Sequence, residues 1–360
     1  MIIPFRNEND NLVFLLKSLN NQSYPANLYE IIAVDDHSTD ETALLIDRAE
    51  YLVNVKFIDN KGEGKKSALR TGVLNSNGQL IVTIDADCIP KKRWLETIAK
   101  NYVTNNFSMM AGPVKMVKIK NLKQKPKNTE FSFFYEPTDE NVNISKSTEK
   151  TALKKTFLSR FQTIEYMSLQ MCGAGAILLN KSVYCSGANL AFDKNDWLDV
   201  VNDVAGKKSL SGDDVFLLHA FKKKKKKIGF IKDKNAIINT KIESNFLGFL
   251  KQRMRWGAKS IYYNDLATIF LTMVVFFCNL FLTVSIVTAF FLCNFYLLFF
   301  LLIKMISDFI LLKQGADFYG IKMPFYEFIA FSVLYPFYLT VTALCSLFIN
   351  VSWKGRKIKQ

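Results

Sequence analysis

Histidine is nearly missing from this chain of 360 residues, which contains only His37 and His219. A zinc site built from several histidines is therefore excluded, and a Ser-His-Asp catalytic triad is disfavoured. The six cysteines are scattered and form no Cys-X-X-Cys pair, which indicates reduced thiols in a protein that faces the cytosol. A secretory signal peptide is also missing, because residues 1–25 begin as a strand and then become polar. The abrupt first strand leaves open whether a further segment precedes it.

Acidic residues are scarce relative to basic ones, 32 against 47, and the formal net charge is +15. No RNA- or DNA-binding motif accompanies this excess, so we expect no nucleic-acid partner. The basic residues gather beside the apolar half of the chain, at 222–227 and at Lys251, Arg253, Arg255 and Lys259. Anionic membrane lipid is the simpler partner for them. The six-lysine run itself is predicted to be a solvated face or turn.

Charged residues are missing altogether between Leu266 and Ile303, a stretch nearly twice the ~20 residues that cross a bilayer. Two membrane spans with a tight turn near Cys293 fit this stretch, the second running to about Leu312. The apolar residues 325–350 predict a third span. Three spans after a cytoplasmic domain would leave the basic tail outside, although its charge favours the inside. The span count and the side of the C-terminus therefore stay open.

Strand and helix patterns alternate over the first ~110 residues, which predicts a parallel, doubly wound α/β sheet. The expected strands are Met1 to Phe5, Glu30 to Val34, Val53 to Ile58 and Leu80 to Ile84, and the expected helices are Asn9 to Gln22, Asp40 to Ala49 and Ser67 to Asn75. Each strand is followed by polar residues, so four strand ends should form a site at one sheet edge. The polar residues 118–155 predict an insertion loop. A helix at 157–170 and a strand at 177–179 should follow it.

Asp85 and Asp87 stand at the end of the apolar strand from Leu80 to Ile84. Aspartate disfavours strand interiors, so the pair should point into the crevice where open α/β sheets bind ligands. Such hard oxygen ligands suit Mg²⁺ or Mn²⁺ bridging a diphosphate. The alternative is a polar turn before the next helix, which Pro90 would begin.

Six short motifs occur in one order along the chain. They are Ile3-Pro4-Phe5-Arg6-Asn7-Glu8, Val34-Asp35-Asp36-His37-Ser38-Thr39-Asp40, Asp85-Ala86-Asp87, Gly187-Ala188-Asn189-Leu190, Ser211-Gly212-Asp213-Asp214 and Gln252-Arg253-Met254-Arg255-Trp256. Together they resemble the family 2 glycosyltransferases, which are inverting enzymes with a nucleotide-diphospho-sugar-binding GT-A fold. The resemblance covers residues 1 to about 260. It implies a Rossmann-like α/β domain, here followed by a C-terminal transmembrane region.

On the donor side, the resemblance implies that Asp36 accepts a hydrogen bond from the nucleotide base, commonly uracil. A helix N-cap is the alternative role for Asp36. Three residues should lie beside the nucleoside, namely Pro4, Arg6 and Glu8. A Gly-Lys stretch also lies near the nucleotide in the family, which implies a contact from Lys65 or, equally, a solvated lysine. His37 stands where many members have glycine, and no role is assigned to it.

The resemblance also implies the catalytic groups. Asp85 should lie near the ribose and sugar, and Asp87 should be the principal ligand of the divalent cation, which neutralises charge on the departing diphosphate. Asp214 should be the general base that deprotonates the acceptor hydroxyl, with Asp213 as its neighbour. Structurally, Ser211 with Asp214 also fits a helix capping box.

The Gln-X-X-Arg-Trp pattern of Gln252, Arg255 and Trp256 implies further substrate contacts. An arginine can bind a pyrophosphate bidentately and a tryptophan can stack under a sugar ring. The same segment could be an interfacial helix that anchors the protein at the membrane surface, and both roles are compatible. Gly187 and Asn189 are predicted to line the acceptor side.

The predicted organisation is a cytoplasmic catalytic domain at 1–245, an amphipathic interfacial segment at 246–264, about three transmembrane helices at 265–350 and a basic tail at 351–360. We expect a membrane-bound, metal-dependent inverting glycosyltransferase that uses a UDP-sugar rather than a GDP-sugar. Its acceptor would be a lipid-linked or growing glycan of the cell envelope. The alternative is a pseudoenzyme that binds nucleotide and membrane without transfer.

Overall fold

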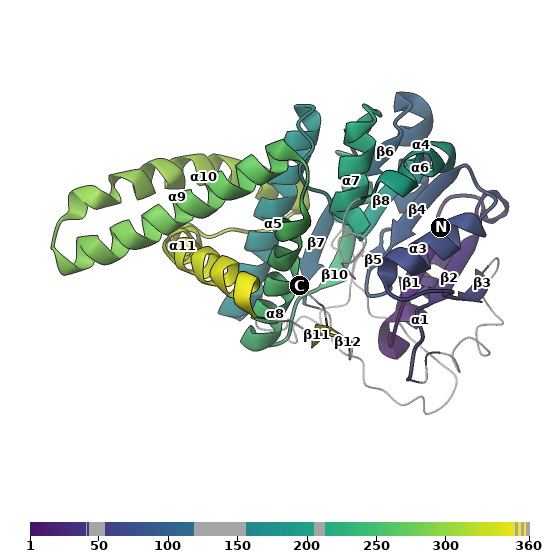
Figure 1. Ribbon diagram of the computed structural model, residues 1–360, viewed down its shortest axis with the longest axis horizontal. Coiled ribbons are helices and arrows are strands. Elements are labelled where there is room, and N and C mark those ends of the chain that lie inside the picture. The colour runs from purple at the N-terminus through teal and green to yellow at the C-terminus, as the bar shows by residue number, and fades with distance from the viewer. Residues whose placement is uncertain are drawn as a thin grey trace, which may run out of the picture.

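The computed structural model describes residues 1–40, 42, 55–118, 156–204, 213–349, 352–353 and 356–357. Nearly all of the helix predicted at 40–49 and of the insertion predicted at 118–155 lies outside these residues, as does Ser211 of the predicted capping box. Figure 1 shows two parts, a sheet flanked by helices and a bundle of long helices that extends away from it.

The main sheet has seven strands in the order β3, β2, β1, β4, β8, β6, β9. Their bounds are Val55–Asp59, Ile31–Asp35, Ile2–Phe5, Leu80–Ile84, Asn189–Asp193, Met109–Ala111 and Ile228–Phe230. The first four strands run parallel, as the sequence predicts. β8 is antiparallel to both of its neighbours, so the complete sheet is mixed rather than wholly parallel. Because β1, β2 and β4 are parallel, their C-terminal ends meet at one edge.

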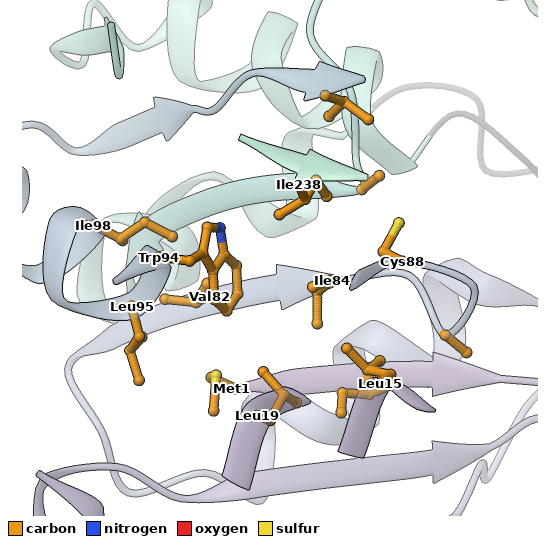
Figure 2. Close-up of a cluster of buried hydrophobic side chains, with 14 of the residues drawn as sticks. Met1, Leu15, Leu19, Val82, Ile84, Cys88, Trp94, Leu95, Ile98 and Ile238 are labelled. Carbon is orange, nitrogen blue, oxygen red and sulfur yellow. The ribbon is translucent and has the colours of Figure 1, made fainter. Parts of the chain in front are cut away.

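Helices cover both faces of this sheet. Helices α1 (Asn9–Asn20) and α4 (Trp94–Asn105) pack on one face, and α3 (Lys65–Leu74), α6 (Lys194–Val200) and α7 (Asp213–Lys223) pack on the other. Successive side chains of a strand point to opposite faces of the sheet, so they pack in two separate hydrophobic cores. Ile3 packs in the core beneath α1 and α4, and Ile2 packs in the core beneath α3, α6 and α7. In Figure 2, Trp94 lies over β4 near Val82, with Ile98 and Leu95 beside it. Both faces are buried, which explains the nearly continuous apolar runs of the strands.

A second, three-stranded sheet contains β5 (Ile89–Pro90), β10 (Ile238–Lys241) and β7 (Val114–Val117), in that order. Helix α5 (Phe157–Leu178) packs against β7. The strand predicted at 177–179 is wrong, because α5 continues to Leu178. The small residues before it mark a close helix contact rather than a turn, since a Cβ at Gly173 would lie 2.9 Å from the carbonyl oxygen of Tyr184.

Three helices within the described residues are long and apolar enough to cross a membrane. They are α9 (Leu266–Phe291), α10 (Phe299–Tyr319, preceded by the 3₁₀ helix η6 at Phe295–Leu298) and α11 (Phe325–Phe348). α10 runs beyond the predicted end at Leu312, because its last turns are buried against α5, with Gly315 lying close to Met167 and Met171. Helix α8 (Phe246–Gly257) packs against α11.

Short elements complete the described chain. They are the 3₁₀ helices η1 (Ala26–Leu28), η3 (Val201–Asp203), η4 (Lys234–Ala236) and η5 (Ala258–Tyr262), and the strands β11 (Ser352–Trp353) and β12 (Arg356–Lys357), which pair with each other.

The lysine run at 222–227 ends α7 in a turn with four of its six lysines exposed, as predicted, and its two half-buried lysines are ion-paired. The Lys222 ammonium lies 2.8 Å from Asp265, just before α9, and the Lys226 ammonium lies 2.8 Å from Asp196 and 2.9 Å from Asp199 on α6. The run closes α7 and turns into β9. Its positive charges therefore tie α7 to its neighbours.

Gly72 offers a test of the packing between α3 and β1. A Cβ at this position would lie 2.4 Å from Cγ2 of Ile2, in a core where strand and helix are already in contact. We expect Gly72→Ala to destabilise the protein by about 1–3 kcal/mol, although alanine favours the helix. The thermal unfolding midpoint of the full chain in detergent measures this effect.

Gly175→Ala is the matched control, because the added Cβ in α5 meets no atom within 4 Å. It should leave the midpoint unchanged or raise it. Equal behaviour of the two variants would contradict the proposed close packing.

Candidate active site

A cleft of about 480 Å³ opens at the C-terminal edge of β1, β2 and β4. Its lining comes from these strand ends, from β7 and β10 of the smaller sheet, from α5, from the start of α7 and from α8 and η5. Twelve of the residues singled out in the sequence line this one cleft, namely Pro4, Arg6, Glu8, Asp36, Lys65, Asp85, Asp87, Gly187, Asp214, Gln252, Arg255 and Trp256. Residues more than 200 positions apart are thus brought together.

Asp36 lies at the end of β2, where it is buried and organises the loop after β3. Its Oδ1 accepts hydrogen bonds from Asn60 Nδ2 at 2.7 Å and from the Gly64 amide at 2.9 Å. Gly64 has φ +84°, which glycine adopts without strain. Asn60 directly follows β3, and its side-chain oxygen also accepts a hydrogen bond from the Ser67 hydroxyl. Asn60, one of the polar residues that the sequence predicts after β3, therefore holds Asp36 in place and does not itself line the cleft.

Arg6 and His37 shape the neighbouring loop. The Arg6 guanidinium donates to the backbone carbonyls of Asp36, at 2.7 Å, and His37. His37 has φ +58°, a left-handed conformation that favours glycine, and its Nε2 lies 2.9 Å from the Gly62 carbonyl oxygen. This backbone conformation gives a physical reason why glycine would serve at position 37.

Asp85 and Asp87 follow β4 and both face the cleft. Lys65, at the start of α3, lies 2.6 Å from Asp85 Oδ1. The Cys88 thiol donates to Asp87 Oδ1 at 3.6 Å, and burial, with the two carboxylates adding to it, raises the pKa of Cys88 well above its usual range. Cys88 is therefore a neutral thiol. Within the described residues no group of three or more His, Cys, Asp or Glu forms a ready-made metal cage.

The charges that line the cleft do not balance. Among its described residues are six carboxylates and four cationic side chains, the latter being Arg6, Lys65, Arg255 and Lys259. One divalent cation would bring this balance to zero. Because Mg²⁺ is commonly held by one or two carboxylates together with substrate phosphates, Asp85 and Asp87 fit such an ion.

Asp214 lies in the first turn of α7. Its Oδ2 accepts from the Gly187 amide at 3.2 Å, its Oδ1 accepts from the Val215 amide at 2.8 Å, and Lys259 of η5 lies 3.4 Å from Oδ1. Burial acts to raise the pKa of this carboxyl, but Lys259, Lys65 and the two amides outweigh it, so the pKa lies below its ordinary value. Asp214 is therefore ionised at neutral pH, as a proton acceptor must be.

Helix α8 forms the remaining wall, where Gln252, Arg255 and Trp256 line the cleft. The ring centroids of Trp256 and Tyr166 are 5.7 Å apart. Arg253, which lies between Gln252 and Arg255 in the sequence, is buried and pairs with Glu165 of α5 at 2.5 Å. Hence one side of α8 faces the cleft while Arg253 faces the interior.

Comparison with known proteins agrees with this arrangement. The model of glycosyl transferase family 2 matches residues 1–168, and that of glycosyl transferase family group 2 matches residues 148–348, more than half of the chain. The chain belongs to glycosyltransferase family 2.

Two relatives of this family member illustrate the range of similarity. Glycosyltransferase AglE of Haloferax volcanii is 30% identical over 121 residues, which are 32% of this chain and 38% of that protein. Undecaprenyl-phosphate 4-deoxy-4-formamido-L-arabinose transferase of Photorhabdus laumondii is 38% identical over 91 residues, which are 24% of this chain and 28% of that protein. The chain thus matches less than half the length of these relatives.

Among solved structures, the family member resembles a mannosyltransferase from Pyrobaculum calidifontis that was determined with GDP-Man and Mn²⁺. The two are 16% identical, the match covers 96% of this chain and 86% of the other, and the TM-score is 0.52. This similarity shows the fold, a mixed α/β fold of the GT-A type with three long apolar helices at the C-terminus.

Two predicted site residues do not fall in the described lining. Asn189 is buried in β8, where its Nδ2 donates to the carbonyls of Pro113 and Ala236, both at 2.9 Å, and its Oδ1 accepts from Trp94 at 3.0 Å. It fastens the two sheets together, and the structure does not support the predicted acceptor contact. For Asp213 the structure gives only the backbone, at the start of α7.

Sequence reasoning missed several cleft residues, of which Lys259, Tyr184 and Tyr263 surround Asp214. The pKa of both tyrosines is raised, mainly by burial and also by Asp214. Lys259 stands three residues after Trp256, close enough in sequence to have been suspected. The tyrosines belong to no motif, and only the fold brings them to the base.

Proposed function

We propose that this protein is a membrane-bound inverting glycosyltransferase that moves a sugar from a nucleoside-diphosphate sugar to a lipid-linked or growing glycan. One observation carries the proposal. A single cleft contains two strand-end carboxylates, a half-buried ionised aspartate next to a lysine, and an arginine and tryptophan on helix α8, which precedes the first long apolar helix in the chain.

The donor would lie along the ends of β1, β2 and β4. Asp36 and Glu8 offer acceptors for the nucleoside, and Lys65 and Arg255 offer positive charge for the diphosphate. We propose a UDP-sugar as donor, since the imide N–H of uracil requires an acceptor such as Asp36. The buried hydrogen bonds that Asp36 makes to the loop at 60–64 keep it in place before the donor arrives.

Mg²⁺ or Mn²⁺ would be held by Asp87 with Asp85, and would neutralise charge on the leaving diphosphate. Lys65 already partners Asp85. We assign the principal ligand role to Asp87, as the resemblance to the family implies, because it lines the cleft together with Asp85.

Asp214 would act as the general base. In the proposed step, the acceptor hydroxyl oxygen bonds to the anomeric carbon while the bond from that carbon to the diphosphate oxygen breaks. The hydroxyl proton passes to the Asp214 carboxylate, and the bonding electrons leave with the nucleoside diphosphate. A single in-line displacement of this kind inverts the anomeric configuration.

The acceptor would approach from the membrane side. Lys259 and Tyr263 line the cleft close to Asp214, and α9 begins at Leu266, only a few residues later. An acceptor with a lipid anchor could therefore reach the base while its tail stays in the bilayer. We propose that α9, α10 and α11 are membrane spans and that the catalytic domain lies on the cytoplasmic side, because nucleotide sugars are made in the cytoplasm.

The first prediction concerns donor turnover. Membranes that contain the protein should release nucleoside diphosphate from one member of a panel of UDP- and GDP-sugars when Mn²⁺ or Mg²⁺ is present. Asp214→Asn should reduce this release at least about 100-fold, as expected when a general base is lost. Asp203→Asn, at an exposed aspartate outside the cleft, is the control and should leave the rate unchanged.

Nucleotide binding without release from any donor, in the presence of the membrane's own acceptors, would favour the pseudoenzyme instead. Release that survives Asp214→Asn would show that another group takes the proton.

The second prediction concerns the metal. Mn²⁺ should tighten UDP binding to the wild-type chain, and Asp87→Asn should remove most of this gain, roughly tenfold or more, because a charged ligand is replaced by a neutral amide. Calorimetric titration with and without chelator measures it. Asp59→Asn is the matched control, since Asp59 ends the neighbouring strand β3 but does not line the cleft. Equal loss in both variants would contradict the assignment.

The third prediction concerns pH. The lowered pKa of Asp214 keeps the base ionised until the pH falls through that pKa, below which activity is lost. Lys259→Met removes the largest favourable charge, so the pKa of Asp214 rises and the acidic limb of the kcat/KM profile moves to higher pH. Lys259→Arg retains a cation and should keep the limb near its original position. A limb that stays in place in Lys259→Met would sink the assignment of the limb to Asp214.

A further inference from the structure

The wall of the cleft that α8 forms is fixed by a buried arginine. Arg253 is 4% exposed, and its guanidinium contacts several cleft residues directly, among them Trp256, Gln252 and Met116. Its Cζ lies 4.2 Å from the centroid of the Trp256 ring, and its Nη1 donates to Gln252 Oε1. The orientation of both side chains therefore depends on where this guanidinium is held.

Arg253 is held by Glu165 of α5. Its Nε lies 3.1 Å from both carboxylate oxygens, and its Nη2 lies 2.5 Å from Oε2, so the pair is bidentate. The Phe249 ring lies 4.8 Å from Cζ. In this dry environment a guanidinium keeps one orientation only if its carboxylate partner is itself held.

The third long apolar helix holds that carboxylate. The Tyr338 hydroxyl of α11 donates to Glu165 Oε1 at 3.1 Å, and the Tyr338 ring stacks on Phe249 at 5.3 Å. A continuous chain of contacts thus runs from α11 through Glu165 and Arg253 to the cleft. Figure 1 shows α11 beside α5 and α8.

We propose that Glu165, Arg253 and Tyr338 are positioning residues, through which α11 holds Trp256 and Gln252 in the geometry that sugar transfer requires. This inference rests on the proposed function only for its effect on turnover. The apolar helix is then part of the active site's support as well as an anchor. Its displacement in the bilayer would reach the cleft through the Tyr338 hydroxyl as well as through the direct packing of α11 on α8.

A second polar link between α5 and α11 is an ion pair that does not involve the cleft wall. Arg160 of α5 pairs with Glu327 at 2.6 Å near the start of α11. Neither residue is among those that line the cleft. That link would hold the helices together without orienting Trp256. General attachment of α11 and positioning of the cleft wall can therefore be separated by mutation.

The test uses Tyr338→Phe, which removes only the hydroxyl and keeps the ring stacked on Phe249. The full chain is labelled with 5-fluorotryptophan in detergent, and the ¹⁹F resonance of Trp256, assigned with Trp256→Phe, reports its surroundings. The other three tryptophans serve as internal references. We expect Tyr338→Phe to shift or broaden the Trp256 resonance alone. It should also lower kcat for nucleoside-diphosphate release roughly tenfold, the size expected for one hydrogen bond to a charged group, with the donor KM within about twofold.

Tyr335→Phe is the matched control. Tyr335 lies one turn earlier on α11, and the centroids of its ring and the Tyr338 ring are 5.9 Å apart. Within the described part of the chain its hydroxyl makes no hydrogen bond. Tyr335→Phe should leave both readouts unchanged. Glu165→Gln tests the next link and should move the Trp256 resonance in the same direction as Tyr338→Phe.

The outcomes separate this inference from the proposed function. An unchanged Trp256 resonance in Tyr338→Phe, or equal changes in Tyr338→Phe and Tyr335→Phe, would overturn the positioning role. A shifted resonance with unchanged release would overturn its effect on transfer. A wild-type protein that releases nothing from any donor would refute the proposed function, while the resonance would still decide the positioning.

Discussion

The arrangement of α5, α8 and α11 depends on pairing the buried positive charge of Arg253, which lies where these three helices meet. Arg253 comes from α8, Glu165 from α5 and the hydroxyl that steadies them from α11. Breaking such a buried pair typically costs about 3–5 kcal/mol, because the remaining charge has neither water nor partner. The pair therefore specifies how the apolar helices dock on the sheet domain. The same docking fixes the position of α8, which forms one wall of the cleft.

A second constraint acts at the edge of the main sheet. Parallel strands end on the same side, so their polar termini gather there whether or not their charges attract. Here the result is an excess of carboxylates in one cleft, relieved partly by Lys65 at Asp85 and Lys259 at Asp214. The same excess makes the cleft suitable for a divalent cation and a donor with phosphate groups. Electrostatic cost and function thus have one origin.

The sequence predicted the regular parts of the molecule well. The strand Leu80–Ile84 and three long apolar helices follow from apolar runs, which are local properties. Predictions failed where a segment's partners decide its state. Residues 177 and 178 form helix because α5 packs through small residues, and α10 continues past Leu312 because its end is buried against α5.

The candidate site shows the same division. Ordered motifs were sufficient to choose Asp36, Asp87 and Asp214 as residues of one cleft, since the six motifs together mark the family. They could not show that Asn189 is engaged in joining two sheets, because its amide partners lie 76 and 47 residues away. Nor could they show Arg253 facing inward.

The sequence by itself determined the first four strands, the three long apolar helices, the family and the motif residues that meet in the cleft, because these follow from local pattern and motif. Only the tertiary structure decided which of neighbouring polar residues face the cleft and which face the interior. Gln252 and Arg253 are adjacent in one helix, yet Gln252 lines the cleft whereas Arg253 is buried against Glu165. Burial and partners come from segments distant in the chain, and no local pattern contains them.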